Sequence, residues 1–264
     1  MRPEADVRQV FGLWDAGLAK AEIARRTGIS RAQVRSWVSA GMDTVLDSPM
    51  RRRSGNRHGL ECDGSCNVVA DVDEQAYAYL LGQYLGDGTI SAAPRCVFRL
   101  RIAACDQYPE IMAECETAMR LVMPSNRVGR IQRVGCTELY SNSKHWPCLF
   151  PQHAPGRKHL RSIRLEPWQG CIAFDSYPER FLRGLFHSDG CRVMNNITHR
   201  LDDGISRYAY PRYFFCNEST DIRWLFIQAC IYLEIEFRYT KANTISIAQR
   251  DSVAKVDSFV GPKR

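Results

Sequence analysis

The chain contains the same ten-residue motif twice. The first copy, YLLGQYLGDG, covers residues 79–88, and the second copy, FLRGLFHSDG, covers residues 181–190. Both copies end in Asp-Gly, have another glycine six positions before the last one, and end a stretch with the apolar spacing of a helix. Their aspartates, Asp87 and Asp189, are 102 residues apart. A repeat of this kind predicts two related structural halves within one chain.

The sequence after each copy predicts the same order of elements. After the first copy we expect a strand at 95–102, a helix near 109–123, a hairpin across 127–141 and a helix running toward Pro151. After the second copy we expect strands near 191–199 and 207–217, a helix at 221–235, a hairpin across 236–248 and a helix at 250–260. Asp73 and Pro178 are suited to begin the two motif helices. This order predicts an α+β fold of two pseudo-symmetric αββαββα halves, at residues 73–168 and 169–264.

The strand at 95–102 indicates what each face of a sheet carries. One side of this strand presents Cys96, Phe98, Leu100 and Ile102. The other side presents Arg95, Val97, Arg99 and Arg101. Such a strand belongs to a sheet with helices beneath it and a basic surface above it. Two such sheets side by side would form a basic saddle for a nucleic-acid duplex.

Small residues in the two motifs predict that their helices pack closely. At four-residue spacing these are Gly82 and Gly86 in the first copy, and Gly184 and Ser188 in the second. Close packing would bring Asp87 and Asp189 together, where two carboxylates repel each other unless divalent cations such as Mg²⁺ bridge them. One copy alone is more typical of helix packing followed by a capping turn. Two copies with matched downstream elements favour a metal site for phosphodiester hydrolysis.

These features resemble the LAGLIDADG homing endonuclease family in its single-chain form with two motifs. The resemblance extends from residue 73 to residue 264. The segments GRKHLRSI at 156–163 and EPW at 166–168 are similar to the stretch before second motifs in the family, and SFVGPKR at 258–264 looks like the counterpart of HAPGRKH. The resemblance implies a monomeric, sequence-specific endonuclease that cuts double-stranded DNA at a long pseudo-palindromic site and leaves short 3′ overhangs. It implies Mg²⁺ or Mn²⁺ as the cofactor.

The resemblance also implies roles for residues at the ends of the motifs. The implied metal ligands are the carboxylates of Asp87 and Asp189 and the backbone carbonyls of Gly86 and Ser188. Lys158 and Lys263 would take equivalent places in the two halves and stabilise charge or position water near the scissile phosphates. Ordinary loop lysines are the alternative. His187 stands where second motifs often carry Asp, and we expect it to pack rather than to tune a ligand.

Polar residues on the upper faces of the expected sheets are candidates for reading DNA. They are Arg99, Arg101, Arg130, Gln132 and Arg133 in the first half, and Arg192, Asn196, Asn217, Arg238 and Lys241 in the second. Each could contact a phosphate, or nothing, as well as a base. The aromatic residues of 208–215 could stack on bases, but an aromatic strand more often belongs to a core.

Residues 1–40 predict a separate small helical domain. Apolar residues recur at helical spacing from Val7 to Val38, and the stretch AEIARRTGISRAQVRSW resembles a helix-turn-helix of the resolvase and homeodomain-like type. Val34, Trp37 and Val38 would face inward, and Ser30 suits the N-cap of the last helix. The residues turned toward the major groove of DNA would be Ser30, Arg31, Gln33 and Arg35. A three-helix module for protein interaction is the alternative.

Residues 41–72 are expected to be a basic linker. Residues 1–60 hold 11 Lys and Arg against 6 Asp and Glu, whereas the remaining residues hold 25 against 23. This excess indicates a polyanionic partner at one end of the chain, or only a surplus that favours solubility. Arg51, Arg52 and Arg53 could follow phosphates or enter a minor groove, or belong to a solvated tether.

Three potential zinc ligands in this linker, His58, Cys62 and Cys66, are spaced four residues apart. A structural zinc site needs four ligands, and the nearest further cysteines, Cys96 and Cys105, fall at an expected strand. We therefore expect incidental thiols and no zinc. The 11 cysteines follow no regular framework, which is typical of reduced thiols in a cytoplasmic protein.

Three functions remain open at this stage. No stretch approaches the ~18 apolar residues of a membrane helix, and residues 1–20 lack the apolar region of a secretory signal. The favoured function is a DNA endonuclease, because both acidic residues, Asp87 and Asp189, are retained. The main alternative is a DNA-binding transcriptional regulator that combines the helix-turn-helix with a LAGLIDADG scaffold that does not cleave. An RNA-binding protein of maturase type is the third.

Overall fold

The computed structural model describes residues 4–42, 45, 62, 66–201, 204–261 and 263. The chain divides into two compact units, Met1–Leu60 and Glu61–Arg264. This boundary falls inside the segment 41–72 that the sequence predicts to be a linker. Within the described ranges, no helix combines the length and the apolar character that a membrane span requires.

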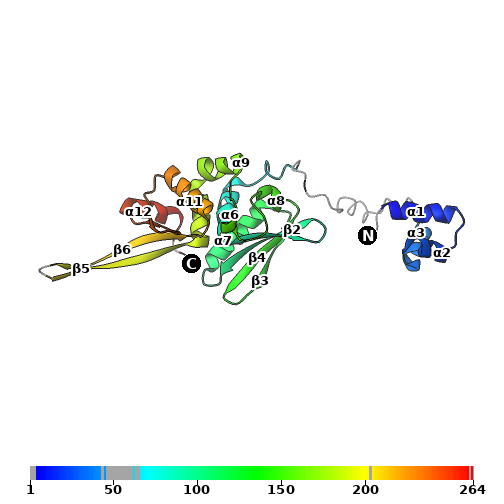
Figure 1. The fold of residues 1–264 in the computed structure, drawn as a ribbon, viewed down its shortest axis with the longest axis horizontal. Helices are drawn as coiled ribbons and strands as arrows, with labels where there is room; N and C mark the ends of the chain where they lie inside the picture. Colours follow the sequence, from blue (N-terminus) through cyan, green and yellow to red (C-terminus); the bar gives the residue numbers. More distant parts are fainter. Residues whose placement is uncertain are drawn as a thin grey trace. The chain divides into compact units, whose positions relative to one another are not determined.

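The N-terminal unit contains three described helices, labelled α1 (Glu4–Asp15), α2 (Lys20–Thr27) and α3 (Arg31–Ala40) in Figure 1. Their shared core includes Val7, Val10, Ile23, Val34 and Trp37. Gly28 ends α2 with a φ of 65°, a left-handed conformation that suits glycine and turns the chain toward α3. Ser30 then caps α3, because its side chain accepts a hydrogen bond from the backbone N–H of Gln33 at 3.3 Å. The helices, the turn and the cap agree with the expected helix-turn-helix.

The second unit contains two halves with the same order of elements. The first half consists of α6 (Glu74–Asp87), β1 (Gly88–Ala93), β2 (Val97–Cys105), α7 (Pro109–Val122), β3 (Val128–Gln132), β4 (Cys136–Ser143) and α8 (Trp146–Leu149). The second half consists of α10 (Pro178–Asp189), β5 (Gly190–Leu201), β6 (Gly204–Cys216), α11 (Thr220–Tyr232), β7 (Arg238–Lys241), β8 (Thr244–Ile247) and α12 (Arg250–Phe259). Three short helices connect them, at Lys158–Leu160, at Pro167–Gly170 (α9) and at Cys171–Ser176. The predicted αββαββα order is confirmed in both halves.

Each half contributes one antiparallel four-stranded sheet. The strand orders are β1-β2-β4-β3 and β5-β6-β8-β7, so the two sheets have the same topology. Gly88, the last residue of the first motif, pairs with Ile102, and Gly190, the last residue of the second, pairs with Phe215. These pairings give the correspondence between the halves residue by residue.

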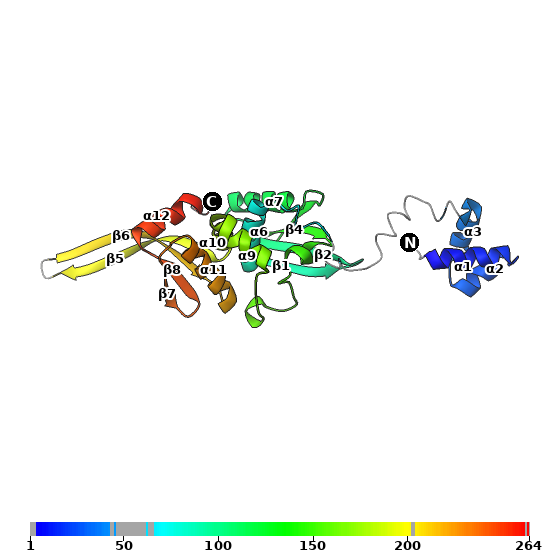
Figure 2. The same ribbon diagram turned by 90° about the horizontal axis from the view of Figure 1, so that it is seen from above.

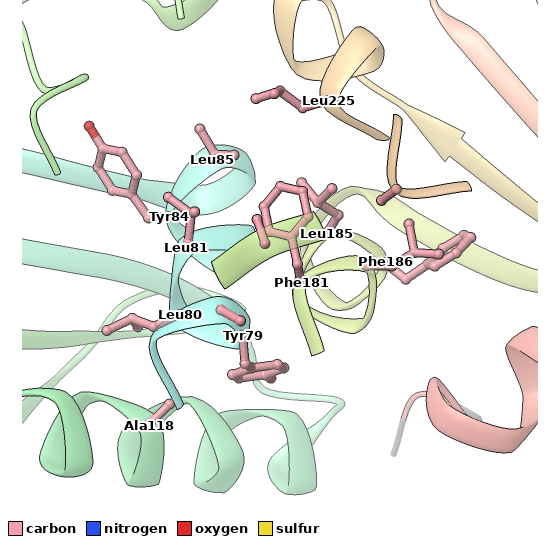
Figure 3. Close-up of a cluster of buried hydrophobic side chains, with 14 of the residues drawn as sticks. Tyr79, Leu80, Leu81, Tyr84, Leu85, Ala118, Phe181, Leu185, Phe186 and Leu225 are labelled. Atoms are coloured by element: carbon pink, nitrogen blue, oxygen red, sulfur yellow. The ribbon is translucent and has the colours of Figure 1, made fainter. Parts of the chain in front are cut away.

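Buried side chains of the two motif helices, α6 and α10, pack together in the core of the second unit, among them Leu81 and Leu85 of α6 and Phe181 and Leu185 of α10 (Figure 3). A hydrogen bond from the backbone N–H of Ala76 to the Asp73 side chain starts α6, and Pro178 starts α10, as predicted. A β-carbon added to Gly82 would lie 2.5 Å from the backbone oxygen of Phe181, and one added to Gly184 would overlap the backbone oxygen of Tyr79. Glycine is therefore required at both positions for the helices to approach this closely.

The halves differ in the length of one hairpin. Strands β5 and β6 contain 12 and 13 residues, whereas their counterparts β1 and β2 contain 6 and 9. Figures 1 and 2 show that the β5–β6 hairpin extends well past the helices of its own half. Among the helices that the structure describes, none lies beneath the distal part of this hairpin.

Candidate metal and DNA site

The two motif aspartates stand at the ends of the central helices. Asp87 is the last residue of α6 and Asp189 the last residue of α10. A β-carbon added to Gly86 would lie 2.8 Å from Oδ2 of Asp189, so the second aspartate reaches across to the backbone of the first motif. Both aspartates line one groove of about 710 Å³. The close packing of the helices thus brings the two carboxyl groups to the same place, as predicted.

The surroundings of the carboxyl groups disfavour their negative charge. Desolvation by the surrounding protein, reinforced by the charge of Asp189, raises the pKa of Asp87 to about 6, although Asp87 remains exposed at the groove. Burial likewise raises the pKa of Asp189. The positive charges of Lys158 and Lys263 oppose both shifts. A divalent cation would relieve the remaining repulsion.

One lysine caps the end of each motif helix. Nζ of Lys158 donates hydrogen bonds to the carbonyl oxygens of Leu85 at 3.0 Å and Gly86 at 2.9 Å, and also to that of Tyr84. Nζ of Lys263 donates to the carbonyl oxygens of His187 at 2.9 Å and Ser188 at 3.3 Å. The C-terminal end of a helix carries partial negative charge, which an ammonium group stabilises.

The two lysines therefore occupy equivalent places in the two halves, as the resemblance implied. Lys158 lies in the same groove as both aspartates, and Lys263 lines an adjoining cavity of about 140 Å³ that also contains Asp87. Burial lowers the pKa of Lys158 to about 8 and also lowers the pKa of Lys263. Neither lysine is an ordinary loop residue exposed to solvent.

Asn217 belongs to this site and not to the sheet face where the sequence placed it. Its side-chain amide donates a hydrogen bond to Oδ2 of Asp189 at 2.6 Å. Asn217 is itself fixed, because its side-chain oxygen accepts from the backbone N–H of Ser219 at 2.7 Å and its carbonyl oxygen accepts from Arg223 at 2.6 Å. Asn217 directly follows β6 and precedes the Ser219 cap of α11, and no local pattern in the sequence shows that it would meet Asp189.

His187 packs, as expected. Its ring lies 3.0 Å from the hydroxyl of Tyr79 and 3.3 Å from the carbonyl oxygen of Val260. Burial lowers the pKa of His187 to about 4, so the ring is neutral at physiological pH. It supports the contact between α6 and the C-terminal segment. It lines the adjoining cavity together with Asp87 and Lys263, but it does not line the groove that contains Asp189.

No family model matches the chain, and no curated protein matches it. Matching solved structures include I-DmoI in complex with DNA and Mn, at 14% identity over 71% of this chain and 97% of that one, with a TM-score of 0.46. The LAGLIDADG meganuclease I-AabMI bound to uncleaved DNA matches at 11% identity over 69% of this chain and 82% of that one, with a TM-score of 0.44. The homing endonuclease I-WcaI bound to its DNA recognition sequence matches at 12% identity over 82% and 89%, with a TM-score of 0.43. The likeness is to LAGLIDADG homing endonucleases.

The sequence predicts that residues reading DNA lie on the face of each sheet opposite its helices. Arg99 and Arg101 lie on this face in β2, where Arg99 donates to Asn142 at 2.9 Å and its guanidinium stacks on Tyr140. Arg133 pairs with Glu138 at 3.2 Å, a residue of the same face. In the second half, Arg238 and Lys241 share the face of Ser246 and Thr244, and both are exposed.

Four other residues do not lie on the predicted face. Arg130 pairs in register with the buried Leu139 and forms an ion pair with Glu116 of α7, so it lies on the helical side of its sheet. Gln132 has the same orientation and donates to Asp106 at 2.8 Å. Arg192 pairs in register with the buried Tyr213 and bonds Asp257 of α12 at 2.7 Å. Asn196, four residues further along β5, shares the side of Arg192 because side chains alternate along a strand.

The aromatic residues of 208–215 divide between the two faces. Tyr213 and Phe215 are buried in the core, as an aromatic strand usually is, whereas Tyr208 is 56% exposed. Arg212, which the sequence analysis missed, lies on the face opposite Tyr213, donates to Ser246 at 2.6 Å and stacks on Phe214. The irregular apolar pattern of this strand hid its register.

The four residues of the N-terminal unit that the sequence predicts to read DNA lie on its surface. Ser30, Arg31, Gln33 and Arg35 are exposed, whereas Val34 and Trp37 are buried. Val38 is partly buried and packs against the same core. The run Arg51, Arg52 and Arg53 lies outside the described residues.

Proposed function

We propose that this protein is a metal-dependent, sequence-specific endonuclease that hydrolyses double-stranded DNA. The observation that carries the proposal is the meeting of Asp87 and Asp189 at the ends of two tightly packed helices, each end capped by a partly buried lysine. Acidic residues at a helical seam between two sheets with basic faces suit a duplex that lies across the sheets. The phosphodiester bonds of each strand would then come close to the carboxylates.

The residues at the seam fit a divalent metal ion. Asp87 and Asp189 offer carboxylate oxygens, which Mg²⁺ and Mn²⁺ prefer. The carbonyl oxygens of Gly86 and Ser188 already accept hydrogen bonds from the lysines, but each keeps a second lone pair that can face a cation. When bound, the metal would activate a water molecule and stabilise the leaving oxygen.

The side chains of the protein would supply the remaining contributions. Lys158 and Lys263, one for each half, would stabilise negative charge that develops on the phosphates. Asn217 would hold the Asp189 carboxylate in its orientation and in its charged form. Arg99, Arg101, Arg133, Arg238 and Lys241 would contact the duplex, and the helix-turn-helix would extend the recognised site by raising the effective concentration of a second reading module.

The experiment that tests this function uses a randomised duplex library with added Mg²⁺ or Mn²⁺. We expect DNA ends to appear at one recurrent sequence motif, on both strands. Asp87→Asn and Asp189→Asn should each abolish cleavage while leaving binding nearly intact. A loss of selective binding in both variants would instead assign a structural role to the aspartates.

A regulator without nuclease activity is the second candidate, and the three-helix N-terminal unit favours it. The same library distinguishes the two functions. Selective retention of DNA without new ends, with either metal, would support the regulator and contradict the endonuclease.

A further inference from the structure

Four side chains with metal-binding atoms meet where the second unit begins. They are Cys62, Cys66, His145 and Cys148, and one ligand atom from each lies within 4.8 Å of every other. The two pairs are far apart in the chain, since 82 residues separate Cys66 from Cys148. None of the four lines the groove that contains Asp87 and Asp189. The cluster is therefore distinct from the candidate catalytic site.

The distances within the cluster are those of ligands around a common ion. Sγ of Cys66 lies 3.6 Å from Sγ of Cys148, and Sγ of Cys148 lies 3.9 Å from Nδ1 of His145. Thiolates about 2.3 Å from a tetrahedral zinc ion lie about 3.8 Å apart, and a thiolate and an imidazole nitrogen lie about 3.6 Å apart. The observed separations of 3.6 and 3.9 Å approach these values.

We propose that Cys62, Cys66, His145 and Cys148 bind a structural zinc ion. Three thiolates and one imidazole are a donor set that structural zinc sites use, and four protein ligands leave no open position for catalysis. All four residues are partly buried, so the ion would be shielded without being closed off from entry. Three cysteines this close would repel one another as thiolates, and zinc removes that repulsion.

Local structure already holds each pair of ligands in place. His145 precedes α8, and its carbonyl oxygen accepts a hydrogen bond from the backbone N–H of Cys148 at 3.1 Å. The backbone N–H of His145 donates to the Ser143 side chain at 3.1 Å, which fixes the turn after β4. In the other ligand pair, Cys66 is followed by a turn. The valines of this turn, Val68, Val69 and Val72, pack against the core.

The zinc ion would fasten the start of the second unit to the end of the first sheet. Cys62 and Cys66 lie just after the boundary between the two units and before α6. A bond through the metal to α8 would fix the point at which the chain from the N-terminal unit enters the second unit. This role does not depend on the proposed nuclease activity.

The linker sequence alone did not predict this site, because only two of its ligands, Cys62 and Cys66, belong to the linker. His58, its third candidate, lies outside the described residues. Cys96 lies in the turn before β2 and Cys105 ends that strand, and neither belongs to the cluster. The missing ligands, His145 and Cys148, are brought to the linker cysteines only by folding.

The test is the metal content of the full-length protein, expressed without a histidine tag and purified without added metal or chelator. Elemental analysis should find about one zinc ion per chain. Replacing zinc with Co²⁺ should produce the visible absorption of a tetrahedral cobalt site together with a thiolate-to-cobalt charge-transfer band. Cys66→Ser and Cys148→Ser should each weaken zinc binding at least about 100-fold, since losing even an outer partner of a metal ligand costs about 10–100-fold.

Matched variants separate metal binding from folding. Cys105→Ser and Cys171→Ser remove exposed thiols outside the cluster and should keep the zinc. His145→Cys preserves a donor at that position and should keep the metal with a changed cobalt spectrum. The double variant Asp87→Asn with Asp189→Asn should also keep it, whether or not the protein is a nuclease.

Two results would overturn the proposal. One is a folded full-length protein that contains no zinc and gives no thiolate–cobalt band when Co²⁺ is added. The other is zinc retained at the wild-type level in both Cys66→Ser and Cys148→Ser.

Discussion

Asn217 donates a hydrogen bond from its side-chain amide to Asp189 at 2.6 Å. The strand pairings place Ala104 at the corresponding position of the first half, and alanine has no donor to offer Asp87. The amide stabilises the charged carboxylate and so opposes the burial that raises the pKa of Asp189. The two aspartates are therefore equivalent in position, but only Asp189 has a side-chain amide at this place to bond its carboxylate.

The substitution Asn217→Ala should slow cleavage and shift its pH dependence. Without the amide, the pKa of Asp189 rises further, so a higher pH is needed to ionise it. We expect the acidic limb of the pH–rate profile to move to higher pH and the rate at pH 7 to fall about tenfold or more. Single-turnover cleavage of labelled duplex measures both. An unchanged acidic limb would show that Asn217 does not act through Asp189.

The substitution Asp87→Asn should stabilise the fold at neutral pH in Mg²⁺-free buffer. The pKa of Asp87 is raised from 3.8 to about 6, so the unfolded chain releases this proton at lower pH than the folded chain does. The contribution of Asp87 to the stability of the wild type therefore falls as pH rises from about 4 to about 6. Asparagine carries no charge, so the variant does not lose this stability. Its Tm should exceed that of the wild type by a few degrees at pH 7.5 and by little at pH 4.

Thermal unfolding at the two pH values measures this difference. Asp175→Asn, which removes an exposed carboxylate outside the groove, is the control and should change Tm by less than Asp87→Asn does. Equal Tm values for Asp87→Asn and the wild type at pH 7.5 would contradict the unfavourable charge at the seam.

The substitutions Lys158→Met and Lys263→Met should affect the two DNA strands unequally. Each lysine caps a different motif helix, so each is expected to act mainly at one scissile phosphate. We expect each variant to slow cutting of one strand about 100-fold, with opposite strand preference, and to accumulate nicked duplex.

The pH dependence provides a second measurement for Lys158. Its pKa is lowered to about 8, so the wild type should lose activity as pH rises through that value. Lys158→Arg retains the positive charge at higher pH. If this variant cuts DNA, its activity should extend to higher pH than that of the wild type. Equal slowing of both strands by each methionine variant would reject the assignment of one lysine to each strand.

The substitution Gly82→Ala should destabilise the second unit by about 2–4 kcal/mol, because the new methyl group would lie 2.5 Å from a backbone oxygen of α10. Gly170→Ala is the matched control, because Gly170 is helical and has nothing within 4 Å of an added β-carbon. That control should be neutral or slightly stabilising. Chemical denaturation of both variants decides the matter, and similar midpoints would contradict the close packing of α6 and α10.

The substitution Arg101→Ala should weaken DNA binding and reduce its salt dependence, whereas Arg130→Ala should do neither. Arg101 lies on the face opposite the helices, but Arg130 is held by Glu116 on the helical side. Loss of one phosphate contact lowers the slope of log affinity against log salt by about 1. Binding titrations at several salt concentrations measure these slopes. Equal slopes for the two variants would show that DNA does not bind the face that contains Arg101.

The repeat in the sequence was enough to predict the αββαββα order of the second unit, although the strand β1 was not among the ranges expected for the first half. Two copies of a helix motif fix two equivalent starting points, and the elements after each follow from apolar period and length. The face of each strand was harder to predict. Where apolar and polar residues alternate regularly, as at Arg99 and Arg101, the predicted face is correct. Arg130 and Arg192 lie on the helical side instead, where each forms an ion pair with a carboxylate of a helix.

The candidate site could be predicted only in part, for a related reason. Asp87 and Asp189 sit inside the motif, so their meeting follows from helix packing. Asn217 meets Asp189 through the register of β6, and His145 meets Cys66 through the path of the chain after β4. Neither contact leaves a local pattern in the sequence, because the partners are brought together by tertiary structure alone.

The unequal length of the β1–β2 and β5–β6 hairpins makes the two halves of the second unit asymmetric. A protein with two identical arms cannot distinguish the two directions of a symmetric target. Here the β5–β6 hairpin is longer than the β1–β2 hairpin. A bound duplex would therefore contact the protein over more base pairs on one side of the site than on the other. A target of this chain would thus have a left and a right side, and the chain would bind it in one direction only.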